Sequence, residues 1–344
     1  MKDPKQLLVR NVFSNWFALA VKVAIVFYMT PFMVHHLGKE SFGVWALVFS
    51  IIAYADFLDL GMRQSLARYL PMYYAIKDYD GLNRVINSSS FMYGIFGTVA
   101  FLAALIIALF FLDLFNVSSE LVSAMRWTLI VVGVSTAIKF YAIPATSIGP
   151  FHRYDIRNTI GVFYRLAGAA VQIYYLSIGY GIVTLAVINL GTTAFGSITS
   201  RLAQQRLVPQ IKFSRRYLNK DTIRKMLSYG SYSFLITIVN LIILSSDNVI
   251  IGITLSATYV TYYAIALTVM MYLRSLMNAI GVPLVPAISH FEATDNLKVV
   301  ADMSERILKY LFYLCTGACC GILIFGADFI RLWMGPGFEL TVDI

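Results

Sequence analysis

The sequence predicts an all-α fold, a polytopic transmembrane helical bundle with about nine spans and a cytoplasmic N-terminus. Its apolar composition, the length of its apolar runs and the placement of its basic residues lead to this prediction. Hydrophobic residues make up 59% of the 344 residues and charged residues 13%, and the mean hydropathy is +0.72. A water-soluble protein of this length needs a largely polar outer shell. The composition therefore indicates that lipid surrounds much of the chain.

The apolar runs set the predicted spans. Each is close to the roughly 20 residues that a helix needs to cross a bilayer. The runs are apolar on all sides, whereas membrane β-strands alternate in polarity, so a β-barrel is excluded. The first run continues past Pro31 without a small-residue cleavage site, which favours a spanning helix over a signal peptide. The predicted spans are 12–35, 42–62, 88–112, 123–145, 159–177, 182–200, 228–252, 259–288 and 309–330.

The basic residues lie in alternate loops. Twenty Lys and Arg residues fall in the loops assigned to the cytoplasm, whereas the opposite side has only Lys39, Arg126 and Arg331. This asymmetry orients the chain by the positive-inside rule. It also explains the net charge of +9 without a nucleic-acid partner. The most basic loop, 201–227, is expected to lie near anionic lipid headgroups, with a site for a cytoplasmic partner as the alternative.

A weak internal repeat predicts two lobes. After a shift of 218 residues, the apolar and aromatic positions of 37–47 coincide with those of 255–265. A repeat of six helices preserves orientation, so the two halves would be parallel, as in many transporters. We therefore expect a six-helix lobe with its basic linker at 1–220 and three helices of a second lobe at 221–344. The second lobe would then be incomplete and the sequence truncated at its C-terminus.

Seven ionisable residues fall inside the predicted spans or close to their ends. A charge at the centre of a membrane helix costs about 2.5–3.5 kcal/mol, so these groups should face water or one another. Polar residues recur on the same helix faces, as expected of helices around a central cavity. Two such stripes hold Asn11, Asn15 and Lys22, and Asn158, Arg165 and Gln172. The seven ionisable residues are Lys22, Asp56, Asp59, Lys139, Arg165, Asp247 and Arg274.

The deep part of this cavity should be positively charged. Asp56 and Asp59 lie near a cytoplasmic helix end beside Arg63, where ion pairs that only fix the packing are the alternative. The four basic residues then outnumber the acids at depth. A positive, water-filled cavity favours an anionic solute such as a phosphate or pyrophosphate group, which Arg can bind in bidentate fashion.

Signals for catalysis are weak. No His/Cys cluster has metal-ligand spacing, and no Walker sequence is present, so no metal or cofactor is expected. Asp78-Tyr79-Asp80 matches the Asp-x-Asp pattern of some glycosyltransferases, but its loop leaves no room for a nucleotide-binding fold. Transport would then depend on an ion gradient, the membrane potential or the substrate gradient. An enzyme is not expected. Cys315, Cys319 and Cys320 are interpreted as packing residues within one apolar run.

Five ordered segments between Leu37 and Gly335 carry a family resemblance. They are Leu37-Gly38-Lys39-Glu40-Ser41-Phe42-Gly43-Val44-Trp45-Ala46-Leu47, Leu58-Asp59-Leu60-Gly61, Ser246-Asp247-Asn248-Val249-Ile250-Ile251-Gly252, Pro286, and Arg331-Leu332-Trp333-Met334-Gly335. Together they resemble the polysaccharide-transporter branch of the multidrug/oligosaccharidyl-lipid/polysaccharide flippase superfamily, which includes O-antigen and lipid-linked oligosaccharide flippases.

The resemblance implies a two-lobed bundle whose central cationic cavity opens alternately to either face. It also implies an undecaprenyl-pyrophosphate-linked glycan as substrate, moved across the bacterial inner membrane for polysaccharide biosynthesis, with other assembly proteins as partners. A cation-coupled multidrug exporter and a non-transport component of glycan assembly are the alternatives. Acidic cavity walls would favour the first alternative, and a large extracytoplasmic loop the second. Carried over by depth and motif, the cavity candidates are Lys22, Asp59, Lys139, Arg165, Asp247 and Arg274.

Overall fold

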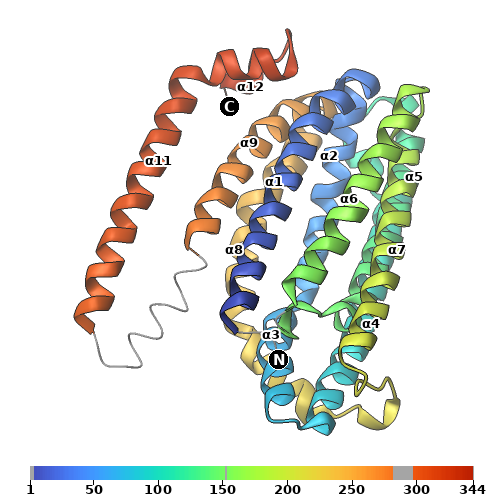
Figure 1. Ribbon diagram of the computed structural model, residues 1–344. Helices are drawn as coiled ribbons and strands as arrows, with labels where there is room; N and C mark the ends of the chain where they lie inside the picture. Colours follow the sequence, from blue (N-terminus) through green and yellow to red (C-terminus); the bar gives the residue numbers. More distant parts are fainter. Residues whose placement is uncertain (1–3, 152, 282–296, 344) are drawn as a thin grey trace. The chain divides into compact units, whose positions relative to one another are not determined.

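The computed structural model describes residues 4–151, 153–281 and 297–343 (Figure 1). Every regular element in these ranges is helical, which confirms the predicted all-α class. The α-helices are α1 (Pro4–Leu37), α2 (Lys39–Ala53), α3 (Met62–Ala75), α4 (Tyr79–Phe110), α5 (Ser119–Ala142), α6 (Tyr154–Ser177), α7 (Ile182–Leu207), α8 (Lys220–Thr254), α9 (Ala257–Gly281), α11 (Leu297–Met334) and α12 (Leu340–Asp343). Short 3₁₀ turns join several of them, namely η1 (Tyr54–Asp59), η2 (Leu112–Leu114), η3 (Pro144–Thr146), η4 (Gly149–Phe151) and η5 (Arg215–Tyr217).

Seven helical segments in the described ranges are long and apolar enough to cross a membrane. They are Phe13–Leu37, Lys39–Asp59, Tyr79–Phe110, Ser119–Ala142, Ile182–Leu207, Phe234–Thr254 and Leu308–Met334. The chain is thus polytopic, as predicted. The other two predicted spans, 159–177 and 259–288, overlap α6 and α9, which have 24 and 25 residues. Residues 282–288 of the second span, with Pro286 of the family resemblance, lie outside the described residues. Both helices are long enough to cross, but neither is among the seven segments, so the nine-span topology stays a prediction.

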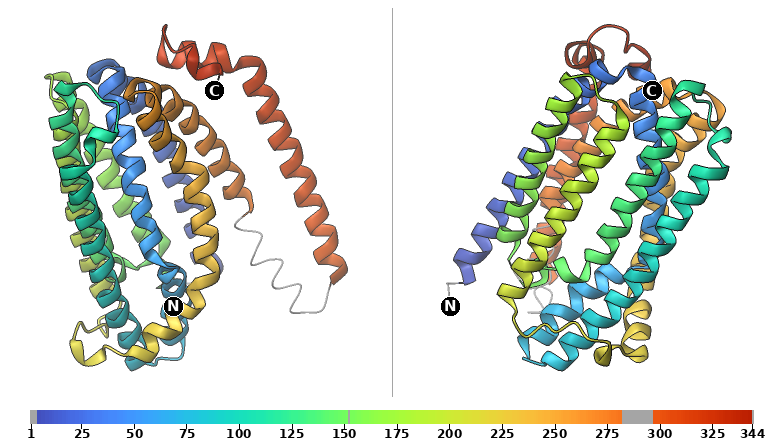
Figure 2. Two further views of the ribbon diagram at one scale, coloured as in Figure 1. Left: turned by 180° about the vertical axis from the view of Figure 1, so that it is seen from behind. Right: turned by 90° about the vertical axis from the view of Figure 1, so that its right-hand side faces the viewer.

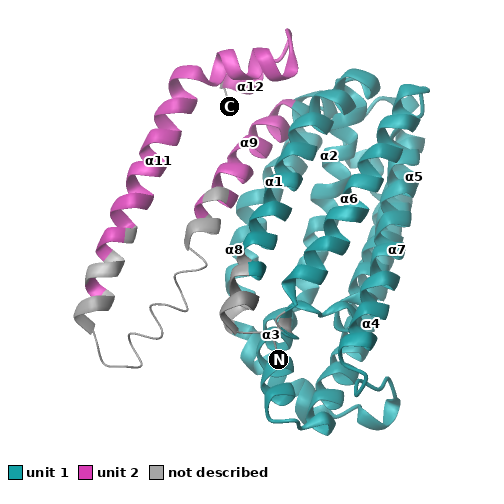
Figure 3. Ribbon diagram, in the orientation of Figure 1, with its two compact units in different colours: residues 1–261 teal, residues 262–344 magenta. Residues whose placement is uncertain are grey.

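The chain divides into two compact units, Met1–Thr261 and Tyr262–Ile344 (Figure 3). Unit 1 contains α1 to α8 and the first turn of α9, and its long helices run side by side in both views of Figure 2. Unit 2 contains the rest of α9 with α11 and α12. The boundary between units falls within α9, whereas the sequence places the lobe boundary at 220/221, which remains a prediction.

Two apolar clusters hold unit 1 together. One joins α2, α4, α5 and α7 with the start of α9 and includes the buried residues Leu47 and Leu129. The other joins α3, the first turns of α4 and the start of α8 through residues such as Leu66, Ile86 and Met226. The second cluster lies at the end of unit 1 where Figure 1 shows the N-terminus of α1 and the loop before α8. The predicted cytoplasmic loops of unit 1 therefore gather at one end.

The segment 63–87, expected to be a loop, is mostly helical, so that expectation is wrong. Helix α3 is amphipathic: Met62, Leu66 and Leu70 recur at four-residue intervals and are buried. Helix α4 begins earlier than predicted because the Asp78 carboxylate caps it, accepting a hydrogen bond from Gly81 N at 2.8 Å. The first residue of the Asp-x-Asp pattern is thus occupied as a helix cap.

Candidate functional site

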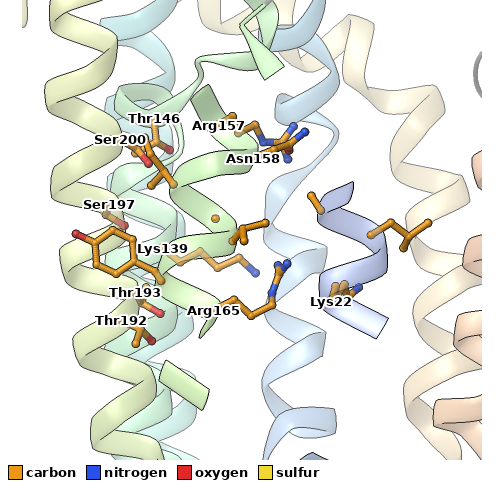
Figure 4. A pocket seen from close by; sticks show the side chains of 17 residues that line it. Lys22, Lys139, Thr146, Arg157, Asn158, Arg165, Thr192, Thr193, Ser197 and Ser200 are labelled. Atoms are coloured by element: carbon orange, nitrogen blue, oxygen red, sulfur yellow. The ribbon is translucent and has the colours of Figure 1, made fainter. Parts of the chain in front are cut away.

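A cavity of about 530 Å³ lies within unit 1, lined by residues of α1, α5, η3, α6 and α7 (Figure 4). This volume is in the range of small-molecule binding sites, roughly 300–1,000 Å³. Helices α6 and α7 supply most of the lining, and α1 closes one side with Ala18, Leu19 and Lys22. Because all of these elements belong to one compact unit, the cavity is defined without reference to the second.

Four basic side chains line the cavity: Lys22 of α1, Lys139 of α5, and Arg157 and Arg165 of α6. The two arginines are eight residues apart, or about 12 Å along the helix, so the positive charge extends over two turns of α6. In Figure 4 the amino group of Lys139 and the guanidinium group of Arg165 point toward the same part of the cavity. No aspartate or glutamate is among the described residues that line it.

Within the described residues, three of the four cations have no carboxylate partner. Lys139, Arg157 and Arg165 form no ion pair with any carboxylate that the structure describes. Lys22 and Arg165 are close enough for their like charges to interact unfavourably. All four residues are solvent-exposed. The cavity therefore concentrates exposed positive charge, an arrangement that an anion would stabilise.

The opposite wall of the cavity is rich in hydroxyl groups. Thr193, Ser197 and Ser200 lie on α7 close to the four-residue spacing that places side chains on one helix face. The Tyr164 hydroxyl on α6 forms a 2.6 Å hydrogen bond with the Thr199 hydroxyl, which ties the two lining helices together. Hydroxyl groups can both donate to and accept from a polar solute, so this wall suits sugar hydroxyls as well as phosphate oxygens.

Helices α1 and α6 are joined by polar contacts next to the cavity. Asn158, which lines it, donates hydrogen bonds from Nδ2 to Asn15 Oδ1 at 2.6 Å and to Ser14 Oγ at 3.2 Å. The two polar stripes predicted on the first and fifth spans thus face each other at this point. Since both stripes continue toward Lys22 and Arg165, this contact helps to place those cations on the same cavity.

An ion cluster holds the end of this α1–α6 contact. Asp155, in the first turn of α6, lies 3.2 Å from Arg10 Nη2 and accepts a hydrogen bond from Arg153 Nε at 3.0 Å. Burial of the Asp155 carboxyl opposes its ionisation, but the hydrogen bonds and charge of Arg153, together with Arg10, lower its pKa below the usual value. This cluster fixes the polar end of α6 beside α1.

Three of the predicted cavity residues do not line this cavity. Asp59 accepts a hydrogen bond from the Tyr93 hydroxyl at 2.5 Å and lies 3.8 Å from Arg63 Nε, as in the ion-pair alternative. Asp247 is on α8 of unit 1, and Arg274 is on the part of α9 that belongs to unit 2. A role for these three residues in solute binding stays a prediction.

Sequence reasoning misses Arg157 and the hydroxyl wall. Arg157 falls among the predicted loop residues, yet the spacing Arg157, Gly161 and Arg165 already places it on the face of α6 that holds the predicted cation. The serines and threonines of α7 give little signal, because hydroxyl groups are common in membrane helices, where they bond to the backbone of the preceding turn.

The fold resembles that of solved multidrug resistance MATE family transporters, whose structures are described as belonging to the MOP superfamily. The chain superposes on the inward-facing structure of a multidrug resistance MATE family transporter with a TM-score of 0.66 and 15% identity, covering 92% of this chain and 75% of that one. The outward-facing structure gives a TM-score of 0.64 at 15% identity, covering 99% and 76%. At such low identity the likeness concerns the fold alone, and the two scores do not distinguish the conformations.

By sequence, the chain belongs to the family described as "Polysaccharide biosynthesis protein", which matches residues 32–343. The "Putative O-antigen transporter" of Shigella flexneri is 20% identical, with 97% of this chain and 78% of that protein aligned. The "Uncharacterized membrane protein EpsK" of Bacillus subtilis is 22% identical, with 97% of this chain aligned and 66% of the relative's length spanned. The chain is thus a multi-pass membrane protein with bacterial relatives, and the predicted family resemblance is confirmed.

Proposed function

We propose that the chain belongs to a flippase that moves a lipid-linked oligosaccharide, joined to its polyprenyl carrier by pyrophosphate, across the bacterial inner membrane. The cluster of Lys22, Lys139, Arg157 and Arg165 on one cavity is the observation that carries the proposal. Bringing a multiply charged headgroup through a medium of low dielectric constant is costly. Basic side chains already gathered on the path offset that cost without a counter-ion from solution.

The two parts of the headgroup would contact different walls of the cavity, the phosphates the basic side chains and the sugars the hydroxyl groups of α7. Phosphate oxygens would contact Lys139 and Arg165, where the guanidinium fork can bind two oxygens at once. Sugar hydroxyls would face the α7 wall at Thr193 and Ser197, while the polyprenyl tail stays in lipid. Membrane transport cycles commonly expose a fixed site to each side in turn by rocking one part against another. We extend this scheme to the present chain, with Asp247 and Arg274 as further candidates.

A cation-coupled multidrug exporter of the same superfamily is the alternative. Such a transporter should present acidic groups to a cationic solute, whereas the described lining of this cavity has basic groups and no acidic one. A membrane enzyme of glycan assembly has less support, because the fold resembles that of solved transporters and Asp78 is engaged as a helix cap. The charge of the cavity thus favours an anionic substrate.

The test is transport by the full-length protein in proteoliposomes loaded with a fluorescent polyprenyl-pyrophosphate oligosaccharide. Replacing Arg165 with Ala should slow flipping about 10- to 150-fold, since hydrogen bonds to charged groups contribute about 1.5–3 kcal/mol. Arg274→Ala should also slow flipping if Arg274 contacts the headgroup. The control is Arg84→Ala, which removes an exposed charge of α4 outside the cavity. Wild-type rates for Arg165→Ala, with the protein folded and inserted, would contradict the proposal.

A further inference from the structure

The end of α7, the connection that follows it and the start of α8 together form the most basic part of the chain, and the transport proposal does not use them. Residues 201–225 contain eight Lys and Arg residues and one acid, Asp221. Its central part, residues 208–219, is here called the α7–α8 linker. A basic loop is often a mobile, solvated tether, so the question is whether this one has a defined structure.

Two buried asparagines of α4 hold the linker in an extended form. Asn83 donates from Nδ2 to Gln210 O at 3.1 Å and accepts at Oδ1 from Lys212 N at 2.7 Å. Asn87 donates to Lys212 O at 2.7 Å and accepts from Ser214 N at 2.8 Å. The two side-chain amides thus bind alternate backbone positions, much as a neighbouring β-strand would. Asn83 is 2% and Asn87 8% exposed, so these hydrogen bonds are buried within the fold.

This attachment determines which way the linker side chains point. In an extended segment, successive side chains project to opposite faces. Ile211 is buried in the apolar cluster of α3, α4 and α8, whereas its neighbour Lys212 is exposed. Arg215 and Arg216, in the turn that follows, are also exposed. The linker therefore presents its cations outward from a backbone fixed on α4.

The length of α4 places this surface at the level of the lipid headgroups. Helix α4 has 32 residues. Its apolar part follows the three serines at 88–90, and these last residues, 91–110, span about 30 Å, the thickness of the hydrocarbon core. Asn87 then lies about 6 Å beyond the core, and headgroups occupy roughly 5–8 Å on each side. Ser88 Oγ accepts a hydrogen bond from Asn219 N at 3.1 Å, so the far end of the linker is at the same level. Arg215 and Arg216 lie between these two attachment points in sequence.

We propose that the α7–α8 linker is a binding surface for the phosphate groups of anionic phospholipids in the cytoplasmic leaflet. Lys212, Arg215 and Arg216 supply the charge, and Arg side chains bind phosphate in bidentate fashion. Phe213 and Leu218, each 37% exposed, add apolar side chains that suit the boundary between headgroups and acyl tails. The Arg201 guanidinium lies 4.9 Å from the Phe213 ring, which keeps a further cation beside the linker.

The depth of the linker decides between lipid and an acidic cytoplasmic protein. A protein partner would best reach charges that project well beyond the headgroups, whereas residues 214–219 are tied to α4 within about two turns of its hydrocarbon-spanning part. The surface is also distinct from the transport cavity, since no linker residue is among the residues that line it. The two proposals can therefore be tested separately. A variant that loses lipid binding at the linker can keep transport, and a variant that loses transport can keep lipid binding.

Native mass spectrometry of the full-length protein, titrated with phosphatidylglycerol and with phosphatidylcholine, tests this assignment. The double variant Arg215→Gln, Arg216→Gln should lose about 30-fold in apparent affinity for phosphatidylglycerol, from about fivefold per basic residue near an anionic surface. The matched control, Lys77→Asn with Arg84→Gln, removes two exposed charges from the α3–α4 region and should change it less than about twofold. Equal losses in both double variants would overturn the proposal, as would a wild-type protein that binds the two lipids equally.

A second variant separates a built surface from net charge. Asn83→Ala with Asn87→Ala removes the four amide hydrogen bonds but keeps every cation. Phosphatidylglycerol binding should fall at least about fivefold, because the cations are then no longer held together at one depth. If the folded double variant still binds phosphatidylglycerol as well as the wild type does, charge alone attracts the lipid. That result would contradict the proposed surface.

Discussion

Replacing Gly43 with Ala should destabilise unit 1 through a backbone collision. Gly43 lies in α2, where that helix meets the start of α9. A Cβ atom added at Gly43 would lie 1.7 Å from the carbonyl oxygen of Ala257 and 2.9 Å from Thr261 Oγ1. The first neighbour is backbone, so no side-chain rotation can relieve the collision. A hydrogen bond also joins the two helices at this contact, since the Thr261 hydroxyl of α9 donates to Lys39 O of α2. The two helices would have to move apart.

The magnitude follows from two opposing terms. Overpacking a tight contact costs about 1–3 kcal/mol and occasionally more, and a 1.7 Å approach to backbone belongs at the upper end of that range. Ala gains about 1 kcal/mol over Gly in a helix. We therefore expect Gly43→Ala to be destabilising by about 2 kcal/mol, visible as a lower apparent Tm of the detergent-solubilised full-length protein.

Gly191→Ala is the matched control. Gly191 also lies within a helix, α7, but nothing comes within 4 Å of an added Cβ atom there. That substitution keeps only the helix-propensity gain and should leave the apparent Tm unchanged or slightly raised. A Gly43→Ala variant as stable as the Gly191→Ala variant would refute the close approach of α2 and α9.

Two further predictions concern polar groups at helix ends. Asp78→Ala removes the N-cap that binds Gly81 N and should cost about 1 kcal/mol of stability, seen as a lower apparent Tm, with flipping per folded molecule unchanged. A loss of flipping per folded molecule would instead indicate a chemical role for Asp78. Because the folded pKa of Asp155 is lowered, its carboxylate stabilises the fold above its usual pKa, and this contribution is lost as the pH falls through the folded value. Asp155→Asn should therefore reduce the apparent Tm at about pH 7 and make the apparent Tm decline less steeply below about pH 4. Parallel curves of apparent Tm against pH for the wild type and the variant would contradict this.

The sequence predicts the helical class, and three of its candidate site residues are among the four basic side chains that line the cavity. Long apolar runs can satisfy their backbone in lipid only as helices or closed barrels, so their length and uniform polarity determine the class. A charge within such a run is costly, and this cost selects Lys22, Lys139 and Arg165. It selects equally the four residues that do not line the cavity, namely Asp56, Asp59, Asp247 and Arg274. Lys22 and Arg165 also lie on the two predicted polar stripes, so helix periodicity places each on the polar face of its helix.

Other features depend on packing and cannot be predicted from the same signals. Helix α3 and the first turns of α4 have one charged face and one buried apolar face. A search for uniformly apolar runs therefore classifies them as a loop. Arg157 is assigned to a loop for the same reason, although it lies in the same helix as Arg165. The extended form of the linker depends on Asn83 and Asn87, more than 120 residues earlier in the sequence, and no local pattern reports such a contact.

Direct binding of polyprenyl pyrophosphate to the purified full-length protein tests the central claim about the cavity. The reference ligand is the polyprenol of the same length without phosphate, so the difference in affinity isolates the contribution of the phosphates. With Lys139 and Arg165 both replaced by Ala, we expect the preference for the pyrophosphate to fall at least about tenfold while polyprenol binding is unchanged. An unaltered preference in this double variant would show that the cationic cavity does not recognise phosphate.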